Sequence, residues 1–219
     1  MVQIKSGEIE LSASWNHAIK PIATLLLAHG AGAGMNHPFM TSLANFLCEL
    51  NISTLRFNFP YIEKGRRAPE SPKIAQQAIV DVVDFIANTG NTQPVIVGGK
   101  SYGGRMASHC AAQGKIDYVA GLVFYGFPLH APGKPSMNRA DHLKDVQIPL
   151  LFLQGTNDQL AQIDIINEVR EGLGNNTTLK TFQSADHSFK VPKSHGIDHQ
   201  SMIMELANQT RFWINDVLK

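Results

Sequence analysis

The stretch Pro94-Val-Ile-Val-Gly-Gly-Lys-Ser-Tyr-Gly-Gly-Arg105 decides the fold of this chain. Its first residues are apolar and β-branched, which favours a buried strand, and the segment after Arg105 is compatible with a helix. Between the two lies Gly99-Lys-Ser-Tyr-Gly103, a G-x-S-x-G pattern that presents a serine on a sharp strand-to-helix turn. The glycines remove Cβ atoms that would collide in such a turn. The pattern predicts a strand–turn–helix unit with Ser101 as a candidate nucleophile.

Two glycine-containing segments invite a phosphate-binding interpretation, and neither fits it well. The first resembles the end of a Walker A loop, but the position that needs a glycine is Pro94, and an apolar strand stands where the loop should be. The second, Gly30-Ala-Gly-Ala-Gly-Met35, begins like a dinucleotide fingerprint. It lacks the third glycine, and the next predicted strand is followed by Asn58 instead of an acid for a ribose.

Length and composition indicate one globular domain over residues 1–219. The chain has 43% apolar residues and a net charge of +1, so no overall field argues for nucleic acid or a membrane as a partner. The amino-terminal segment has no apolar signal core, and no apolar run approaches membrane-spanning length, which favours a cytoplasmic location. The two cysteines, Cys48 and Cys110, fall in predicted helices and suit buried, reduced thiols.

Strand-like and helix-like segments alternate along the chain, which predicts an α/β fold with a mostly parallel eight-stranded sheet covered by helices. The expected strands are Val2–Lys5, Ile9–Trp15, Thr24–Ala28, Ile52–Phe57, Val95–Gly98, Tyr118–Tyr125, Pro149–Gln154 and Leu179–Gln183. The expected helices are Pro38–Leu50, Pro72–Asn88, Ser101–Gln113, Gln162–Gly172 and His199–Leu218, with Ser71 as the N-cap of the second.

An acid and a base follow Ser101 at the ends of later strands. Asp158 comes after the seventh predicted strand and His187 after the eighth, which is the chain order Ser, acid, His of the α/β-hydrolase fold. His187 would take the proton of Ser101, and Asp158 would fix the imidazole tautomer. Asp186 is the alternative acid, but neighbouring side chains tend to point apart. None of the eight other histidines directly follows the last strand.

The turn His29-Gly-Ala-Gly32 follows the third predicted strand. In the α/β-hydrolase fold this turn supplies one oxyanion-hole donor, and the residue after the nucleophile supplies the other. We therefore expect the backbone N–H groups of Ala31 and Tyr102 to converge on the carbonyl oxygen of a substrate.

Several longer segments carry a family resemblance. The chain resembles small α/β-hydrolases of the dienelactone-hydrolase-like group, which includes relatives of testis-expressed and NSL-complex hydrolase-like proteins, often described as predicted esterases. The segments that carry it are His29–Phe39, Arg56–Tyr61, Gly99–Arg105, Tyr125–His130, Gly155–Asp158 and Ala185–Phe189. The resemblance covers nearly the whole chain and implies the same three residues, Ser101, Asp158 and His187. True dienelactone hydrolases use a cysteine nucleophile where this chain has Ser101, so dienelactone itself is not the expected substrate.

The sequence says less about the substrate. Only about twenty residues, Gly126 to Val146, separate the sixth and seventh predicted strands, where a lid is usually inserted, so we expect an open site. Four basic residues could favour an anionic substrate, although such charges are more often solvated or cap helices. They are Lys100, Arg105, Arg66 and Arg67.

These observations predict a serine hydrolase that cleaves a small-molecule carboxylic ester or thioester through an acyl-enzyme. No metal or organic cofactor is implied, and the oligomeric state is left open. The alternative is a binding or scaffold protein that keeps the fold without turnover. A peptidase is disfavoured because such enzymes bring a propeller or cap that this length cannot hold.

Overall fold

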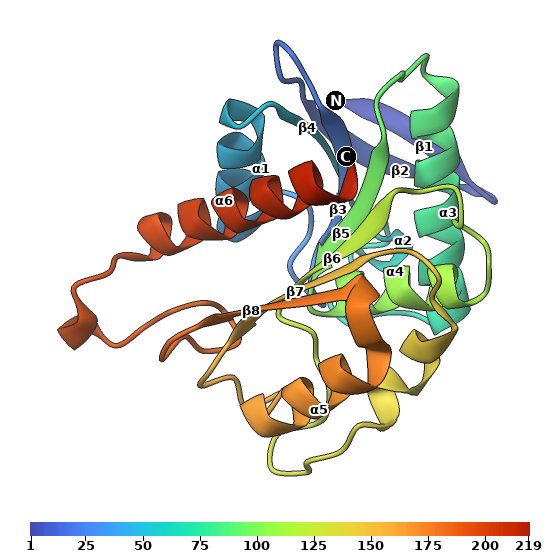
Figure 1. The fold of residues 1–219 in the computed structure, drawn as a ribbon. Coiled ribbons are helices and arrows are strands. Elements are labelled where there is room, and N and C mark those ends of the chain that lie inside the picture. The colour runs from blue at the N-terminus through green and yellow to red at the C-terminus, as the bar shows by residue number, and fades with distance from the viewer.

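The computed structural model describes residues 1–219, and one eight-stranded sheet forms its centre (Figure 1). The strand order is β1-β2-β4-β3-β5-β6-β7-β8; β3 to β8 run parallel, and β1 and β2 are antiparallel to their neighbours. This is the predicted α/β-hydrolase sheet. The strands are β1 (Val2–Ser6), β2 (Ile9–Asn16), β3 (Ala23–Ala28), β4 (Ile52–Phe57), β5 (Val95–Lys100), β6 (Gly121–Tyr125), β7 (Leu150–Gly155) and β8 (Thr177–Phe182).

Helices cover both faces of the sheet (Figure 1). One core lies under α1 (Pro38–Glu49) and α6 (His199–Val217). The other lies under α3 (Pro72–Asn88), α4 (Tyr102–Ala112) and α5 (Ile163–Leu173). A short helix, α2 (Pro60–Glu63), follows β4.

The buried central strand β3 connects the two cores. Its six residues are all buried, and successive side chains point to opposite faces because a strand repeats every two residues. Leu25 and Leu27 pack under α1 and α6, whereas Leu26 and Ala28 pack under α3 and α4. This explains why the sequence of β3 is apolar except for the buried Thr24 and shows no polar alternation.

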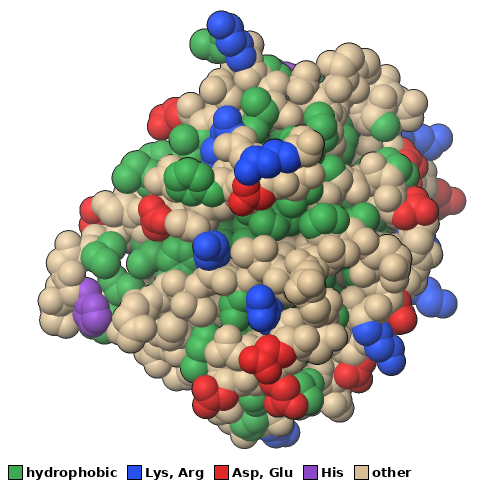
Figure 2. Space-filling view, in the orientation of Figure 1, with side chains coloured by type: hydrophobic (Ala, Val, Ile, Leu, Met, Phe, Trp, Pro, Cys, Tyr) green, Lys and Arg blue, Asp and Glu red, His purple; other side chains and the backbone are tan.

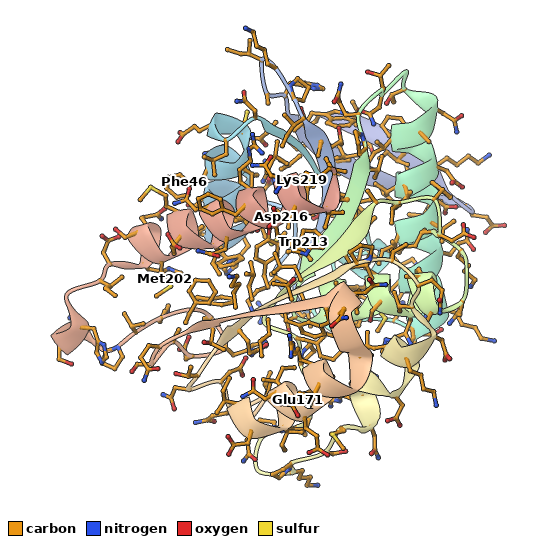
Figure 3. All side chains as sticks on the ribbon, viewed as in Figure 1. Phe46, Glu171, Met202, Trp213, Asp216 and Lys219 are labelled. Atoms are coloured by element: carbon orange, nitrogen blue, oxygen red, sulfur yellow. The ribbon has the colours of Figure 1, made fainter.

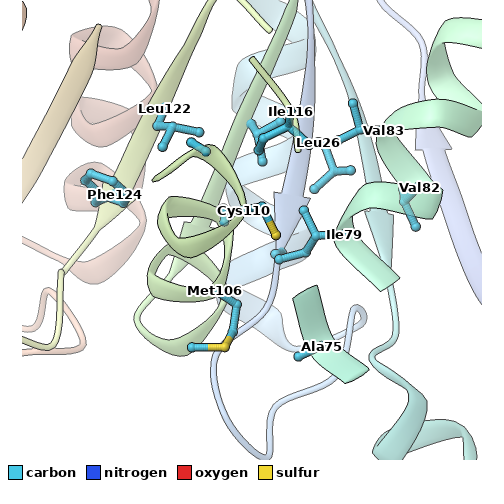
Figure 4. Close-up of a cluster of buried hydrophobic side chains, with 14 of the residues drawn as sticks. Leu26, Ala75, Ile79, Val82, Val83, Met106, Cys110, Ile116, Leu122 and Phe124 are labelled. Atoms are coloured by element: carbon cyan, nitrogen blue, oxygen red, sulfur yellow. The ribbon is translucent and has the colours of Figure 1, made fainter. Parts of the chain in front are cut away.

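Side chains from the helices close each core. On one face, Met106 and Cys110 of α4 pack near Ile79 of α3 (Figure 4). On the other, α6 carries Met202 and Trp213 (Figure 3), and the Trp213 ring lies so close to Gly121 that a Cβ there would be 2.7 Å from it. The first contact joins two helices, and the second holds α6 against β6.

The elements that the sequence predicted are present, with shifted boundaries. The strand expected at Tyr118–Tyr125 begins only at Gly121, because the chain before it forms turns that leave Tyr118 54% exposed. The last strand begins two residues earlier than expected, at Thr177. Ser71 does precede α3, but its side chain makes no capping hydrogen bond.

The structure also differs from the sequence prediction in two short helices and in the burial of one cysteine. The short helix α2 and a 3-10 helix over Asn138–Asp145 both lie in segments where no helix was expected. Cys110 is buried, and burial raises the pKa of its thiol to about 12. Cys48 is only partly buried, contrary to expectation.

No helix combines the length and the apolar composition that a membrane span needs. On the face seen in Figure 2, acidic and basic side chains are interspersed, in keeping with the net charge of +1.

The sharp turn between β5 and α4 depends on glycines. A Cβ on Gly103 would lie 2.5 Å from the carbonyl oxygen of Ala28 in β3, and a Cβ on Gly99 would overlap the backbone of Gly104. Because these obstacles are backbone atoms, they cannot move aside as the end of a flexible side chain would. The first turn of α4 therefore touches β3 and β5 only where side chains are missing.

The segment between β3 and α1, residues 29–37, is held by buried and partly buried polar groups of the β4–α2 segment. Arg56 donates from Nη1 to the Met35 carbonyl (2.8 Å), and Asn58 Oδ1 accepts from the Met35 N–H (2.8 Å). The Tyr61 hydroxyl accepts from the Gly32 N–H (2.9 Å). These bonds satisfy backbone groups that would otherwise be unpaired in a tight loop.

His29 anchors the start of the same segment. Its ring is fully buried, donates from Nδ1 to the Gly30 carbonyl (2.7 Å) and accepts at Nε2 from the Phe59 N–H (3.2 Å). This pairing requires the neutral Nδ1–H tautomer. Burial lowers the pKa of His29 to about 4, although the bond to Gly30 opposes the shift and His37 adds to it.

We predict that Gly103→Ala lowers the free energy of unfolding by about 2–4 kcal/mol, because the new Cβ meets backbone. Gly172→Ala is the matched control. Gly172 lies in α5 with nothing within 4 Å of its added Cβ, so that variant should be neutral or gain up to about 1 kcal/mol. Urea unfolding measures both; equal stability of Gly103→Ala and the wild type would contradict the close approach.

We also predict a pH dependence of stability from His29. Its folded-state pKa of about 4 lies below the 6.5 of an unfolded histidine, so only the unfolded chain binds the proton as the pH falls between these values. The free energy of unfolding should therefore drop by about 2–3 kcal/mol more in the wild type than in His29→Gln between about pH 6.5 and 4.5. An NMR titration checks the same point directly: a His29 pKa near that of a free imidazole would contradict it.

Candidate active site

Ser101 lies on the turn between β5 and α4 in a strained backbone conformation. Its φ is 50° and its ψ is −109°, and its N–H donates to the Tyr125 carbonyl of β6 (3.2 Å). A non-glycine residue rarely adopts such a positive φ, and it persists only where the surrounding structure imposes it. The close glycine packing of α4 against β3 and β5 supplies that constraint. The hydroxyl is thereby presented at the carboxyl edge of the sheet.

The structure brings Ser101, His187 and Asp158 together as the sequence predicted. Ser101 Oγ is 2.8 Å from His187 Nε2, and His187 Nδ1 is 2.6 Å from Asp158 Oδ2. The carboxylate can only accept, so His187 donates from Nδ1 and its Nε2 is free to accept the serine proton. The three side chains form one continuous line of hydrogen bonds from a buried carboxylate to a partly buried hydroxyl.

Asp158 is held in place by partners that the sequence analysis did not name. Gln154, fully buried at the end of β7, donates from Nε2 to Asp158 Oδ2 (2.5 Å) and accepts at Oε1 from the Phe127 N–H (3.0 Å). The Leu160 N–H donates to Asp158 Oδ1 (2.7 Å). Such donors replace the hydrogen bonds to water that a carboxylate loses on burial. A polar residue at the end of an apolar strand was the signal that could have indicated Gln154.

Asp186, the alternative acid, has a different task. Its Oδ1 accepts from the N–H groups of Ser188 (2.8 Å) and Lys190 (2.9 Å), which closes the turn that carries His187. Its side chain is therefore directed along the turn and away from the imidazole. Asp158, as expected, is the acid that contacts His187.

Lys100 supports the His187 turn from β5. Its Nζ donates to the His187 carbonyl (2.7 Å) and lies 5.7 Å from the centre of the Phe189 ring. Burial lowers the pKa of Lys100 to about 8, while the charges of Asp158 and Asp186 oppose the shift. A cation therefore links the strand that ends at Ser101 to the turn that carries its base.

The sequence predicted the backbone N–H groups of Ala31 and Tyr102 as oxyanion donors. The Ala31 N–H donates to no group of the protein. Tyr102 is the first residue of α4, so its N–H is one of those without an intrahelical acceptor. The two segments are in contact, since a Cβ on Gly30 would lie 3.9 Å from Ser101 Cβ. Both N–H groups therefore remain the predicted oxyanion donors.

Three of the four basic residues that the sequence predicted as substrate contacts lie outside the cleft beside Ser101. Arg66 is exposed and 3.6 Å from Glu70. Arg105 lies in α4, where burial and then the charge of Arg139 lower its pKa. Neither of them nor Arg67 lines the cleft beside Ser101; among the four predicted basic residues, Lys100 alone does.

The cleft beside Ser101 has a volume of about 360 Å³ and is open to solvent. Its lining comes from the β3–α1 segment, the β5–α4 turn and the segment after β8: Gly30, Ala31, Ala33, His37, Phe39, Met40, Lys100, Ser101, Leu160, His187, Ser188, Lys190 and His199. A hollow of about 440 Å³ between β8 and α6 is larger but contains neither a histidine nor a serine. Of these two hollows, the cleft is the one that combines space with a paired hydroxyl and imidazole.

The chain is similar to known hydrolases in sequence and in fold. Residues 21–215 match the family described as alpha/beta hydrolase domain. Among solved structures, the protein Est1E from Butyrivibrio proteoclasticus with ferulic acid bound superposes with a TM-score of 0.80 at 15% identity, covering 100% of both chains.

Two further structures show the same fold. A dienelactone hydrolase from Anabaena variabilis has a TM-score of 0.79 at 20% identity and covers 98% of this chain and 95% of its own. A serine hydrolase without a lid from Xanthomonas campestris has a TM-score of 0.71 at 17% identity, covering 99% and 92%. The family match spans most of the sequence, and the chain therefore belongs to the alpha/beta hydrolase family.

Proposed function

We propose that this protein is a serine hydrolase that cleaves small carboxylic esters or thioesters through an acyl-enzyme. The observation that carries the proposal is the hydrogen-bonded line Asp158–His187–Ser101 on a strained turn. Serine is a weak nucleophile unless a base within hydrogen-bond reach removes its proton. The 2.8 Å separation of Ser101 Oγ and His187 Nε2 meets that requirement without any rearrangement.

In the first half of the reaction, Ser101 Oγ attacks the carbonyl carbon while its proton passes to His187 Nε2. The resulting imidazolium is stabilised by Asp158, which also keeps the ring oriented. The tetrahedral intermediate collapses as the bond to the leaving oxygen or sulfur breaks. The leaving group takes the proton from His187, and the acyl group remains as an ester of Ser101.

In the second half, water takes the place of the leaving group. His187 accepts a proton from the water as its oxygen attacks the acyl carbon, and then returns that proton to Ser101 Oγ as the acid departs. Each half of the reaction passes through a tetrahedral intermediate that carries a negative oxygen. The Ala31 and Tyr102 N–H groups are suited to bind it, and such donors typically each contribute about 10²–10³ to turnover.

The shape of the cleft favours small substrates. The segment between β6 and β7 folds as loops and one 3-10 helix, and of its residues none lines the cleft. A volume of about 360 Å³ lies at the lower end of small-molecule sites and offers no long apolar channel. A structural relative named as an esterase domain, and another named as a serine hydrolase without a lid, are in keeping with this proposal.

We predict that the wild type hydrolyses p-nitrophenyl acetate and that Ser101→Ala lowers kcat/KM by at least about 10³-fold, because the nucleophile is lost. Ser71→Ala is the matched control; Ser71 is exposed, makes no capping bond, and lies outside the cleft. Spectrophotometric release of p-nitrophenol measures all three. A folded wild type with no activity on short esters or thioesters would favour the alternative of a non-catalytic binding protein.

A further inference from the structure

The cleft beside Ser101 is lined by cations and imidazoles and by no carboxylate. Its charged and titratable lining groups are Lys100, Lys190, His37, His187 and His199. Two acidic residues of the neighbouring segments are bonded within the protein. Asp158 accepts from His187, and Asp186 accepts from the backbone N–H groups of Ser188 and Lys190. A substrate entering the cleft therefore meets two lysine side chains and no carboxylate.

Of the two lysines, Lys190 is the one free to bind a ligand. Lys100 is bonded to the His187 carbonyl and faces the charges of Asp158 and Asp186. Lys190 is exposed, and its ammonium forms no ion pair; the lysine and arginine ion pairs of the chain go only to Glu70 and Asp216. An unpaired ammonium in the wall of a candidate substrate cleft is a natural partner for an anionic group.

His37 adds a ring N–H donor to the lining of the same cleft. Its Nδ1 accepts from the Phe39 N–H (3.2 Å), so the ring proton of the neutral form lies on Nε2, which has no partner in the protein. The residue also precedes α1, whose first turn carries no acidic side chain. The positive end of the α1 dipole therefore acts in the same direction as Lys190.

We propose that the substrate carries a carboxylate a few bonds from its scissile ester, and that Lys190 and His37 bind this carboxylate across the cleft from Ser101. The inference rests on the proposed function and names its substrate class: a half-ester of a small dicarboxylic acid, or the ester of a hydroxy acid. The shared chemistry is one carboxylate and one ester within a molecule small enough for about 360 Å³. The charge of Lys190 thus selects substrates that carry a carboxylate, while the ester bond is cleaved at Ser101.

The test compares matched esters that differ in charge. In one arm the carboxylate is on the leaving group, with para-acetoxybenzoate measured against para-acetoxybenzamide. In the other it is on the acyl group, with mono-p-nitrophenyl adipate measured against p-nitrophenyl hexanoate. We expect the anionic ester to be preferred by at least about five-fold in kcat/KM in one arm at about 20 mM salt, and the preference to shrink at about 0.5 M.

Variants of Lys190 then test whether this residue causes the preference for the anionic ester. Lys190→Gln should bring the anionic-to-neutral ratio of kcat/KM close to one, and Lys190→Arg should restore most of it. Lys193→Gln is the control, because it removes the same charge three residues along from an exposed side chain that does not line the cleft. We expect this control to keep the ratio of the wild type.

Several results would overturn the inference. One is a ratio near one in both arms for the wild type, and another is an equal loss of the ratio in Lys193→Gln and Lys190→Gln, which would assign it to the general surface charge. Either can occur while p-nitrophenyl acetate is still hydrolysed in a Ser101-dependent manner, so the substrate class can fail alone. If no ester is hydrolysed, the proposed function fails with it.

Discussion

The approach of α4 to β3 and β5 without intervening side chains is the constraint on which the site depends. Gly99 and Gly103 allow backbone to lie against backbone, and this contact holds Ser101 at a φ of 50°. Such strain costs of order 1–3 kcal/mol and must be offset by the packing around it. The buried contacts of α4 with α3 and with the sheet supply that packing. The position of the serine is thus a property of the whole centre of the fold.

Polar contacts distant in sequence complete the site. Gln154 orients Asp158 from the end of β7, Lys100 ties the His187 turn to β5, and the β4–α2 segment holds the loop that carries Ala31. Most of these groups are buried or partly buried, where an unpaired polar atom is costly, so each bond specifies one arrangement of its segment. None of these supporting side chains needs to touch the substrate, yet together they fix the separation of the proposed nucleophile, base and oxyanion donors.

The sequence could predict the sheet and the three central residues because their signals are local. Ser101, Asp158 and His187 each follow a recognisable strand, and parallel strands end at one edge of a sheet. The supporting contacts could not be predicted, since Lys100 and the His187 carbonyl are 87 residues apart and only the fold brings them together. For the same reason Arg66 and Arg67 were singled out, whereas Lys190, His37 and His199 line the cleft. The late start of β6 shows that apolar residues such as Val119 can be buried by a turn as well as by a strand.

The central claim is that the fold activates one serine out of all those in the chain. Labelling of the folded protein with a fluorophosphonate probe, followed by peptide mapping in a mass spectrometer, tests it most directly. The account predicts a single covalent adduct, on Ser101, because only this hydroxyl lies both in a substrate-sized cleft and beside an imidazole oriented by a carboxylate. An adduct on another serine, or a folded protein that stays unlabelled, would contradict it.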